Sequence, residues 1–101
     1  MIVVRNVFQL KYGKAKEVVA LAKEALVLQM KVISDVDFST RLLTDVSGRF
    51  YTLVVELTVP NLATFETQGP RLFADKDFQA NSQKMAALVD SGYRDIFTIV
   101  E

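Results

Sequence analysis

The chain has 101 residues, half of them apolar, and its twelve basic and twelve acidic side chains give no formal net charge. This composition excludes the basic excess of a nucleic-acid-binding protein and the low hydrophobicity of a disordered chain. The length predicts one domain over residues 1–101 that buries about two thirds of the surface exposed on unfolding. Histidine, cysteine and tryptophan are absent, which removes disulfides and the usual ligands of zinc.

The hydropathy pattern contains no export signal and no membrane span. No basic region precedes the short apolar start at 2–4, which a signal peptide requires. The longest uncharged apolar stretch, 25–30, is far shorter than the roughly 20 residues that cross a bilayer. We therefore expect a soluble, cytoplasmic protein without a membrane partner.

In chain order, the first predicted element is a strand over residues 2–11, in which apolar side chains alternate with more polar ones. Asn6 falls on the more apolar face, where a buried amide needs hydrogen-bond partners or a ligand. Gly13 ends this strand. A long helix is then expected from Ala15 to Ile33, because apolar residues recur there at three- and four-residue steps.

The middle of the chain predicts a hairpin followed by a short helix. Residues 38–45 alternate weakly, which indicates an edge strand, whereas 50–59 carry the strongest alternation in the chain. Gly48 supplies the positive φ that a turn between them needs. The helix is expected over 62–68 and to end at the Gly69-Pro70 pair.

One more helix and one strand complete the chain. Asn61 and Asp75 have the side chains of helix N-caps, and Gly92 is expected to end the last helix. A final strand is predicted over 93–101. The order βαββααβ predicts a ferredoxin-like α+β fold, with a four-stranded antiparallel sheet that has helices on one face.

The other face of that sheet combines valines with charged side chains. The residues assigned to it are Val3, Arg5, Val7, Gln9, Arg41, Leu43, Thr52, Val54, Glu56, Arg94 and Ile96. Apolar patches of more than a few hundred Å² are rare on soluble monomers, so we expect a homodimer that packs two such faces together. Arg5, Gln9 and Glu56 are its polar contacts, with Arg5 and Glu56 as a structural ion pair. The alternative is a monomer in which this face of the sheet is exposed to solvent.

Two segments resemble a known superfamily. Residues 6–17 are similar to the first strand and helix start of the dimeric α+β-barrel superfamily, and residues 88–100 to its last helix and strand. This group includes antibiotic-biosynthesis monooxygenases, their heme-degrading relatives and NIPSNAP-like proteins. The resemblance in element order covers the whole chain. It implies a dimeric barrel with a small pocket between sheet and helices in each subunit.

The resemblance also narrows the chemistry. In the heme-degrading branch an asparagine seven residues before the strand-ending glycine faces the pocket, and Asn6 with Gly13 has this spacing. That branch requires a histidine and a tryptophan that this chain lacks, which argues against heme degradation. The cofactor-independent monooxygenase branch implies no cofactor and no metal. It implies a small aromatic or quinol-type substrate that reacts directly with dioxygen.

In such a pocket, Asn6 would hold a phenolate-like oxygen, and Tyr51 or Tyr93 would donate or relay a proton. The apolar walls would be Phe8, Leu53, Phe65, Phe73, Phe78 and Met85. The alternative is that these side chains form ordinary core. The chain would then be a non-catalytic ligand-binding or assembly member of the superfamily.

Overall fold

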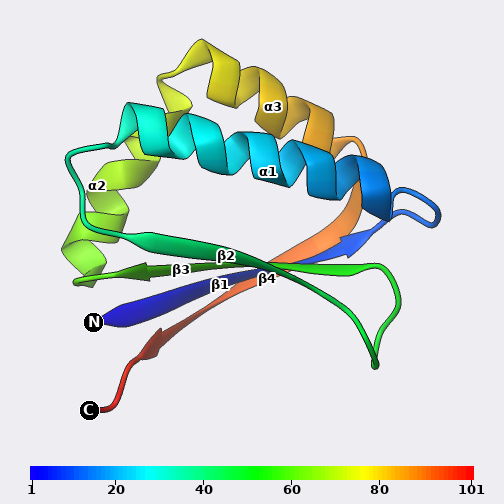
Figure 1. Ribbon diagram of the computed structural model, residues 1–101, viewed down its shortest axis with the longest axis horizontal. Helices are drawn as coiled ribbons and strands as arrows, with labels where there is room; N and C mark the ends of the chain where they lie inside the picture. The colour runs from blue at the N-terminus through cyan, green and yellow to red at the C-terminus, as the bar shows by residue number, and fades with distance from the viewer.

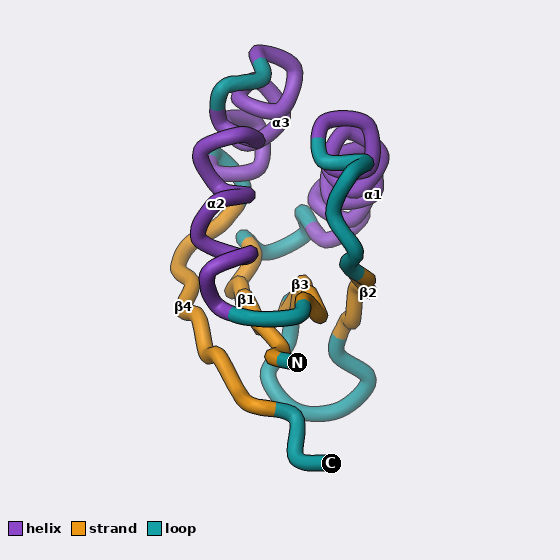
Figure 2. Tube along the Cα trace, turned by 90° about the vertical axis from the view of Figure 1, so that its left-hand side faces the viewer, coloured by secondary structure: helices purple, strands orange, loops and turns teal.

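The computed structural model describes residues 1–101 and contains four strands and three helices (Figure 1). The elements are β1 (Ile2–Leu10), α1 (Ala15–Val32), β2 (Ser39–Thr44), β3 (Thr52–Val59), α2 (Leu62–Phe73), α3 (Lys76–Ala86) and β4 (Val89–Thr98). The strands form one antiparallel sheet in the order β2-β3-β1-β4. All three helices lie on the same side of this sheet (Figure 2). The predicted ferredoxin-like α+β fold is confirmed.

The hydrophobic core between sheet and helices has two parts. One contains Leu10, Val18 and Leu53, where α1 packs on the central strands. The other contains Val4 and Leu57 at the opposite end of the sheet. None of the helices combines the length and the apolar character that a membrane crossing requires.

The last strand begins earlier than the sequence predicts. Helix α3 ends at Ala86, and Gly92 lies inside β4 opposite Phe8. A Cβ atom on this glycine would lie 2.8 Å from Cδ1 of the Phe8 ring. The prediction that Gly92 ends the helix was therefore wrong, because the glycine accommodates a close aromatic neighbour within the sheet.

The register of β4 also corrects the assignment of sheet faces. Arg94 pairs with Asn6, and directly opposed residues share a face, so Arg94 lies on the helix-covered face, as does Ile96. Tyr93 pairs with Val7 and lies on the bare face. The prediction that Arg94 and Ile96 belong to the bare face was wrong. Alternation divides a strand into two sets of residues but does not say which set meets the helices.

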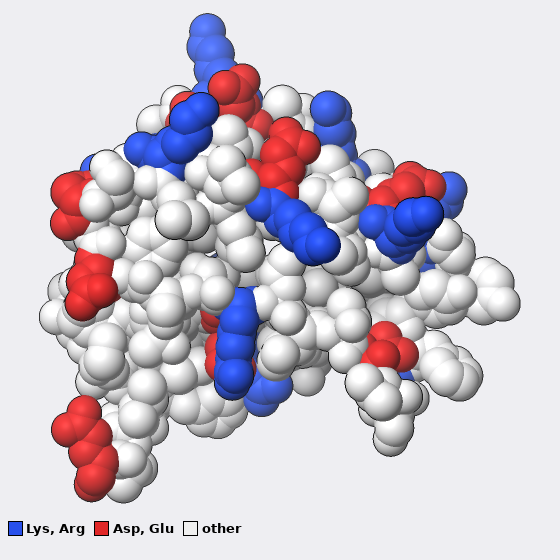
Figure 3. Space-filling model, viewed as in Figure 1, with Lys and Arg blue, Asp and Glu red and all other residues white.

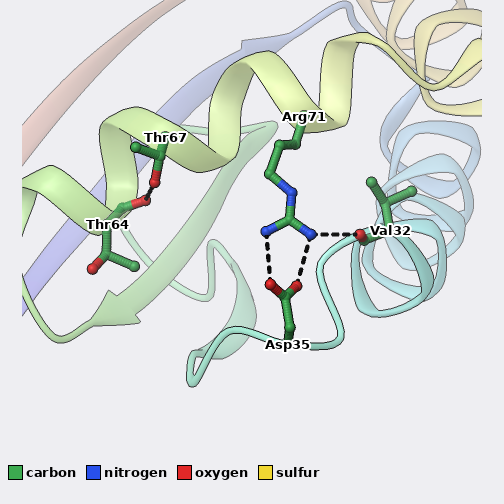
Figure 4. A network of polar contacts seen from close by, with 5 residues as sticks. All are labelled: Val32, Asp35, Thr64, Thr67 and Arg71. Atoms are coloured by element: carbon green, nitrogen blue, oxygen red, sulfur yellow. Dashed lines mark hydrogen bonds and ion pairs between the residues drawn. The ribbon is translucent and has the colours of Figure 1, made fainter.

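Helix α2 continues through Gly69 and Pro70 to Phe73, so its predicted end at residue 68 was also wrong. Its last turn is anchored by Arg71, whose two terminal nitrogens donate to the Asp35 carboxylate at 2.7 and 3.1 Å (Figure 4). One of these nitrogens also donates to the Val32 carbonyl oxygen at 3.3 Å. The helix thus continues past the glycine-proline pair, and its last turn contacts the end of α1 and the segment that follows it.

This ion pair predicts a pH-dependent stability. The hydrogen bond from Arg71 holds the pKa of the Asp35 carboxyl below its usual value. A lowered folded-state pKa stabilises the fold above the unfolded pKa of about 3.9, and this stabilisation is lost as the pH falls through the folded value. Asp35→Asn should therefore lower the melting temperature slightly at pH near 7 and have almost no effect at pH near 2.

Thermal melts of the two proteins across this pH range provide the measurement. Asp37→Asn is the matched control, because Asp37 is exposed and makes no side-chain hydrogen bond or ion pair. An equal loss of melting temperature at both ends of the range would contradict the assignment of the effect to the carboxylate.

Candidate functional site

Asn6 is the centre of a polar cluster on the helix-covered face of the sheet. It lies on β1 between Val55 of β3 and Arg94 of β4. Its Oδ1 accepts a hydrogen bond from Nε of Arg94 at 2.6 Å. The guanidinium carbon of Arg94 lies 5.1 Å from the ring centroid of Phe65 on α2, a cation–π distance. We call this group the Asn6 cluster.

The Asn6 cluster is rich in hydrogen-bond donors that have no protein partner. The amide oxygen of Asn6 accepts the hydrogen bond from Arg94, whereas the Nδ2 group of Asn6 donates to no protein atom. Arg94 is an exposed residue, and its terminal nitrogens make no hydrogen bond or ion pair within the protein. Amide and guanidinium donors bind anionic oxygens such as a phenolate or carboxylate, and the Phe65 ring offers an apolar face beside them.

Helix α2 also carries an unusual polar residue, Gln68, which lies one turn beyond Phe65. Its side chain is buried, and neither its amide oxygen nor its amide nitrogen has a hydrogen-bond partner. Sequence reasoning missed Gln68, whose only signal was a polar residue at helical spacing between Phe65 and Leu72. It also missed Arg94, because the face of β4 was assigned incorrectly.

The two predicted tyrosines do not join the Asn6 cluster. Tyr93 lies on the bare face of the sheet and is 61% exposed. Tyr51 precedes β3, four residues before Val55, the β3 partner of Asn6. The structure therefore places no tyrosine where it would exchange a proton with a ligand held by Asn6.

The predicted pocket walls are distributed over three places. Phe8 and Met85 pack against the core cluster that contains Leu53. Phe65 is the only predicted wall residue in the Asn6 cluster. Phe73 and Phe78 pack edge to face at a centroid distance of 5.3 Å, close to where α2 leads into α3.

Two hollows on the protein surface lie away from Asn6. One of about 750 Å³ lies between the first half of α1 and the β2–β3 connection, and Tyr51 lines it. Another of about 400 Å³ lies at one end of the bare sheet face, where Gln9 and Tyr93 line it. Neither hollow is lined by Asn6.

The bare face carries a row of alternating charges across all four strands. In strand order the row is Arg41, Glu56, Arg5 and Asp95, as the strand register places them. Glu56 lies 2.7 Å from Nε of Arg41 and 3.4 Å from Nε of Arg5. The predicted pairing of Arg5 with Glu56 is confirmed, and Arg41 is an additional partner.

Beside this charged row runs an apolar row. Its members in strand order are Leu43, Val54, Val7 and Tyr93. Gln9, which the sequence assigned to the dimer contact, lies next to this row on β1, and its Nε2 donates to the carbonyl oxygen of Phe50 at 2.7 Å. Phe97 of β4 lies on the same bare face and is 50% exposed.

No protein-family model and no curated protein matches the sequence. Solved structures do match its fold. An uncharacterized NIPSNAP domain protein from Burkholderia xenovorans is 18% identical with a TM-score of 0.85, over 99% of this chain and 95% of that one. SnoaB, a cofactor-independent oxygenase from Streptomyces nogalater, is 15% identical with a TM-score of 0.73, over 99% and 93%.

An antibiotic biosynthesis monooxygenase is 16% identical with a TM-score of 0.74, over the full length of both chains. Identities this low show a common fold and leave the activity open. The chain thus has the ferredoxin-like fold of NIPSNAP and antibiotic-biosynthesis-monooxygenase-like proteins, as the resemblance in the sequence predicts.

Proposed function

We propose that this protein binds a small aromatic or quinol-type substrate at the Asn6 cluster and promotes its monooxygenation without a cofactor. The observation that carries the proposal is the set of unpartnered donors on Asn6 and Arg94, which fits an ionised substrate oxygen. The ring of Phe65 beside them fits an aromatic substrate. The shared fold with a cofactor-independent oxygenase is compatible with this chemistry.

The donors would act by stabilising the ionised form of the substrate. Hydrogen bonds and positive charge at a phenolic oxygen lower its pKa, and the resulting phenolate gives electrons to dioxygen more readily than the phenol does. For a quinol, one oxygen atom enters a ring C–H bond and the other leaves as water. The quinol becomes a hydroxyquinone and supplies all the electrons, so no external reductant is needed.

The first test of this proposal is Asn6→Ala. A hydrogen bond to a charged oxygen contributes about 1.5–3 kcal/mol, so quinol-dependent oxygen uptake should fall roughly 10- to 100-fold. An oxygen electrode and a panel of quinols and polyphenols give the measurement. Gln83→Ala on the exposed surface of α3 is the control and should keep the activity of the unmodified protein.

A second candidate is a non-catalytic protein that binds the same class of ligand. The positions of Tyr51 and Tyr93 away from Asn6 favour it, since neither tyrosine hydroxyl belongs to the Asn6 cluster. In that case a quinol should raise the melting temperature without oxygen uptake, and Asn6→Ala should remove the rise. If Asn6→Ala only lowers stability, by about 1–3 kcal/mol, Asn6 serves the fold alone and both candidates fail.

We also propose that the protein forms a homodimer through the bare face of the sheet. The apolar row and the exposed Phe97 support this, because such a patch is stabilised when it leaves water. Light scattering at micromolar concentration should give twice the chain mass of 11.3 kDa.

A further inference from the structure

The hollow between α1 and the β2–β3 connection differs from the Asn6 cluster in position and in chemistry. Its volume of about 750 Å³ is in the range of small-molecule sites. The lining residues that matter here are Lys16, Val19 and Lys23 of α1, with Asp45, Phe50 and Tyr51 of the connection. We call it the α1 hollow.

The backbone of the α1 hollow is strained at Tyr51. This residue has φ of +55°, and it is the only residue other than glycine with a positive φ. The strained position is held by several contacts: its carbonyl oxygen accepts from Leu10 N at 2.8 Å and from Gln9 Nε2 at 3.2 Å. Its ring packs on Tyr12 at a centroid distance of 5.0 Å. Strain that the surroundings fix in this way is concentrated at ligand sites.

Phe50 is an aromatic residue of the α1 hollow whose ring packs on no other aromatic ring. Phe50, next to the strained tyrosine, lines the hollow and is 78% exposed. Its main chain is nevertheless fixed, because its carbonyl oxygen accepts the hydrogen bond from Gln9 Nε2 at 2.7 Å. Together with Tyr51 and Val19 it gives the hollow an apolar and aromatic wall that suits a flat ring.

The charges around the α1 hollow favour an anion. Lys16 and Lys23 lie seven residues apart on α1, which places them on the same side of the helix. Neither forms an ion pair, whereas the one carboxylate of the lining, Asp45, accepts a hydrogen bond from Thr52 N at 3.0 Å. Figure 3 shows a basic side chain of the helical layer that projects toward the sheet, with acidic side chains just above it.

From these observations we propose that the α1 hollow is a second ligand site, which binds a small aromatic carboxylate. The carboxylate is held by Lys16 or Lys23, and the ring lies against Phe50 and Tyr51. This inference is independent of the activity proposed for the Asn6 cluster, because the two sites share no residue.

The test uses 2-naphthoate as the probe and maps its position by amide chemical shifts of the full chain. We expect a dissociation constant of about 0.1–1 mM, with shifts concentrated in the first half of α1 and at residues 44–52. The double variant Lys16→Gln with Lys23→Gln should weaken binding by about 10-fold or more. Lys31→Gln, an exposed lysine in the last turn of the same helix, should leave it unchanged.

Two further measurements separate this site from the Asn6 cluster and from simple apolar binding. Asn6→Ala should not change the titration of the shifts at residues 44–52 and in the first half of α1, even where it changes 2-naphthoate binding at the Asn6 cluster. The neutral alcohol of the same ring should bind the α1 hollow more weakly and without dependence on the lysines. The proposal is overturned by any of three results: no shifts at the α1 hollow up to about 10 mM, shifts confined to the Asn6 cluster, or an unchanged titration of the α1-hollow shifts in the double lysine variant. Far-UV circular dichroism of each variant establishes that it is folded before it is compared.

Discussion

Replacing Val54 with aspartate should prevent the proposed homodimer from forming. Val54 lies in the apolar row of the bare face between Leu43 and Val7, at the centre of the proposed contact. A carboxylate there would lose its hydration on dimerisation without gaining a partner, at a cost of several kcal/mol. Sedimentation or light scattering should then give 11.3 kDa in place of twice that mass.

Val46→Asp is the matched control for this experiment. Val46 lies in the β2–β3 connection and is fully exposed, so the same added charge should leave the dimer intact. If the two variants have the same mass as the unmodified protein, the bare face is not the contact. If the unmodified protein is itself a monomer at micromolar concentration, no such dimer forms.

A large loss of stability is expected for Gly92→Val. The Cβ atom alone would lie 2.8 Å from the ring of Phe8 and 3.3 Å from the carbonyl oxygen of Val7, and valine adds two methyl groups. Overpacking of this kind costs about 3 kcal/mol at the upper end of its usual range. Urea denaturation should therefore show a lower free energy of unfolding at an unchanged m-value.

Gly69→Ala provides the comparison, since a Cβ atom there meets nothing within 4 Å. Alanine is the better helix former, but a Cβ atom directly before Pro70 is disfavoured in helical conformation, so this change should alter the free energy of unfolding by less than about 1 kcal/mol. Combining Gly92→Val with Phe8→Ala should cost less than the sum of the two changes, because the smaller side chain removes the clash. Strict additivity would show that Phe8 is not the group that the new side chain meets.

The elements that the sequence predicted well are those with a purely local cause. The caps at Asn61 and Asp75 are confirmed, since their side chains accept from Thr64 N at 2.8 Å and Phe78 N at 2.9 Å. Gly48 has the positive φ expected in the β2–β3 connection. The faces of β1 and β3 were assigned correctly, because each of these central strands has one clearly more apolar side in addition to its alternation.

The wrong predictions concern features that depend on contacts between residues far apart in the chain. Arg94 was assigned to the wrong face because β4 is an edge strand, whose two faces have similar polarity. The last turn of α2 contacts Asp35, which lies 36 residues from Arg71 in the chain. The sequence placed Asn6 on the helix-covered face but could not predict its contact with Arg94, since the register of β4 brings the two together across 88 residues.

The charged row on the bare face has a consequence for how two copies would align. Its signs alternate from one strand to the next, and neighbouring strands are about 4.8 Å apart. A second sheet displaced sideways by one strand would therefore bring like charges together where opposite charges had faced each other. The charged row would therefore fix the lateral alignment of the two sheets, because a shifted arrangement costs electrostatic energy. The hydrophobic contacts of the neighbouring valines are non-directional and would not select one alignment.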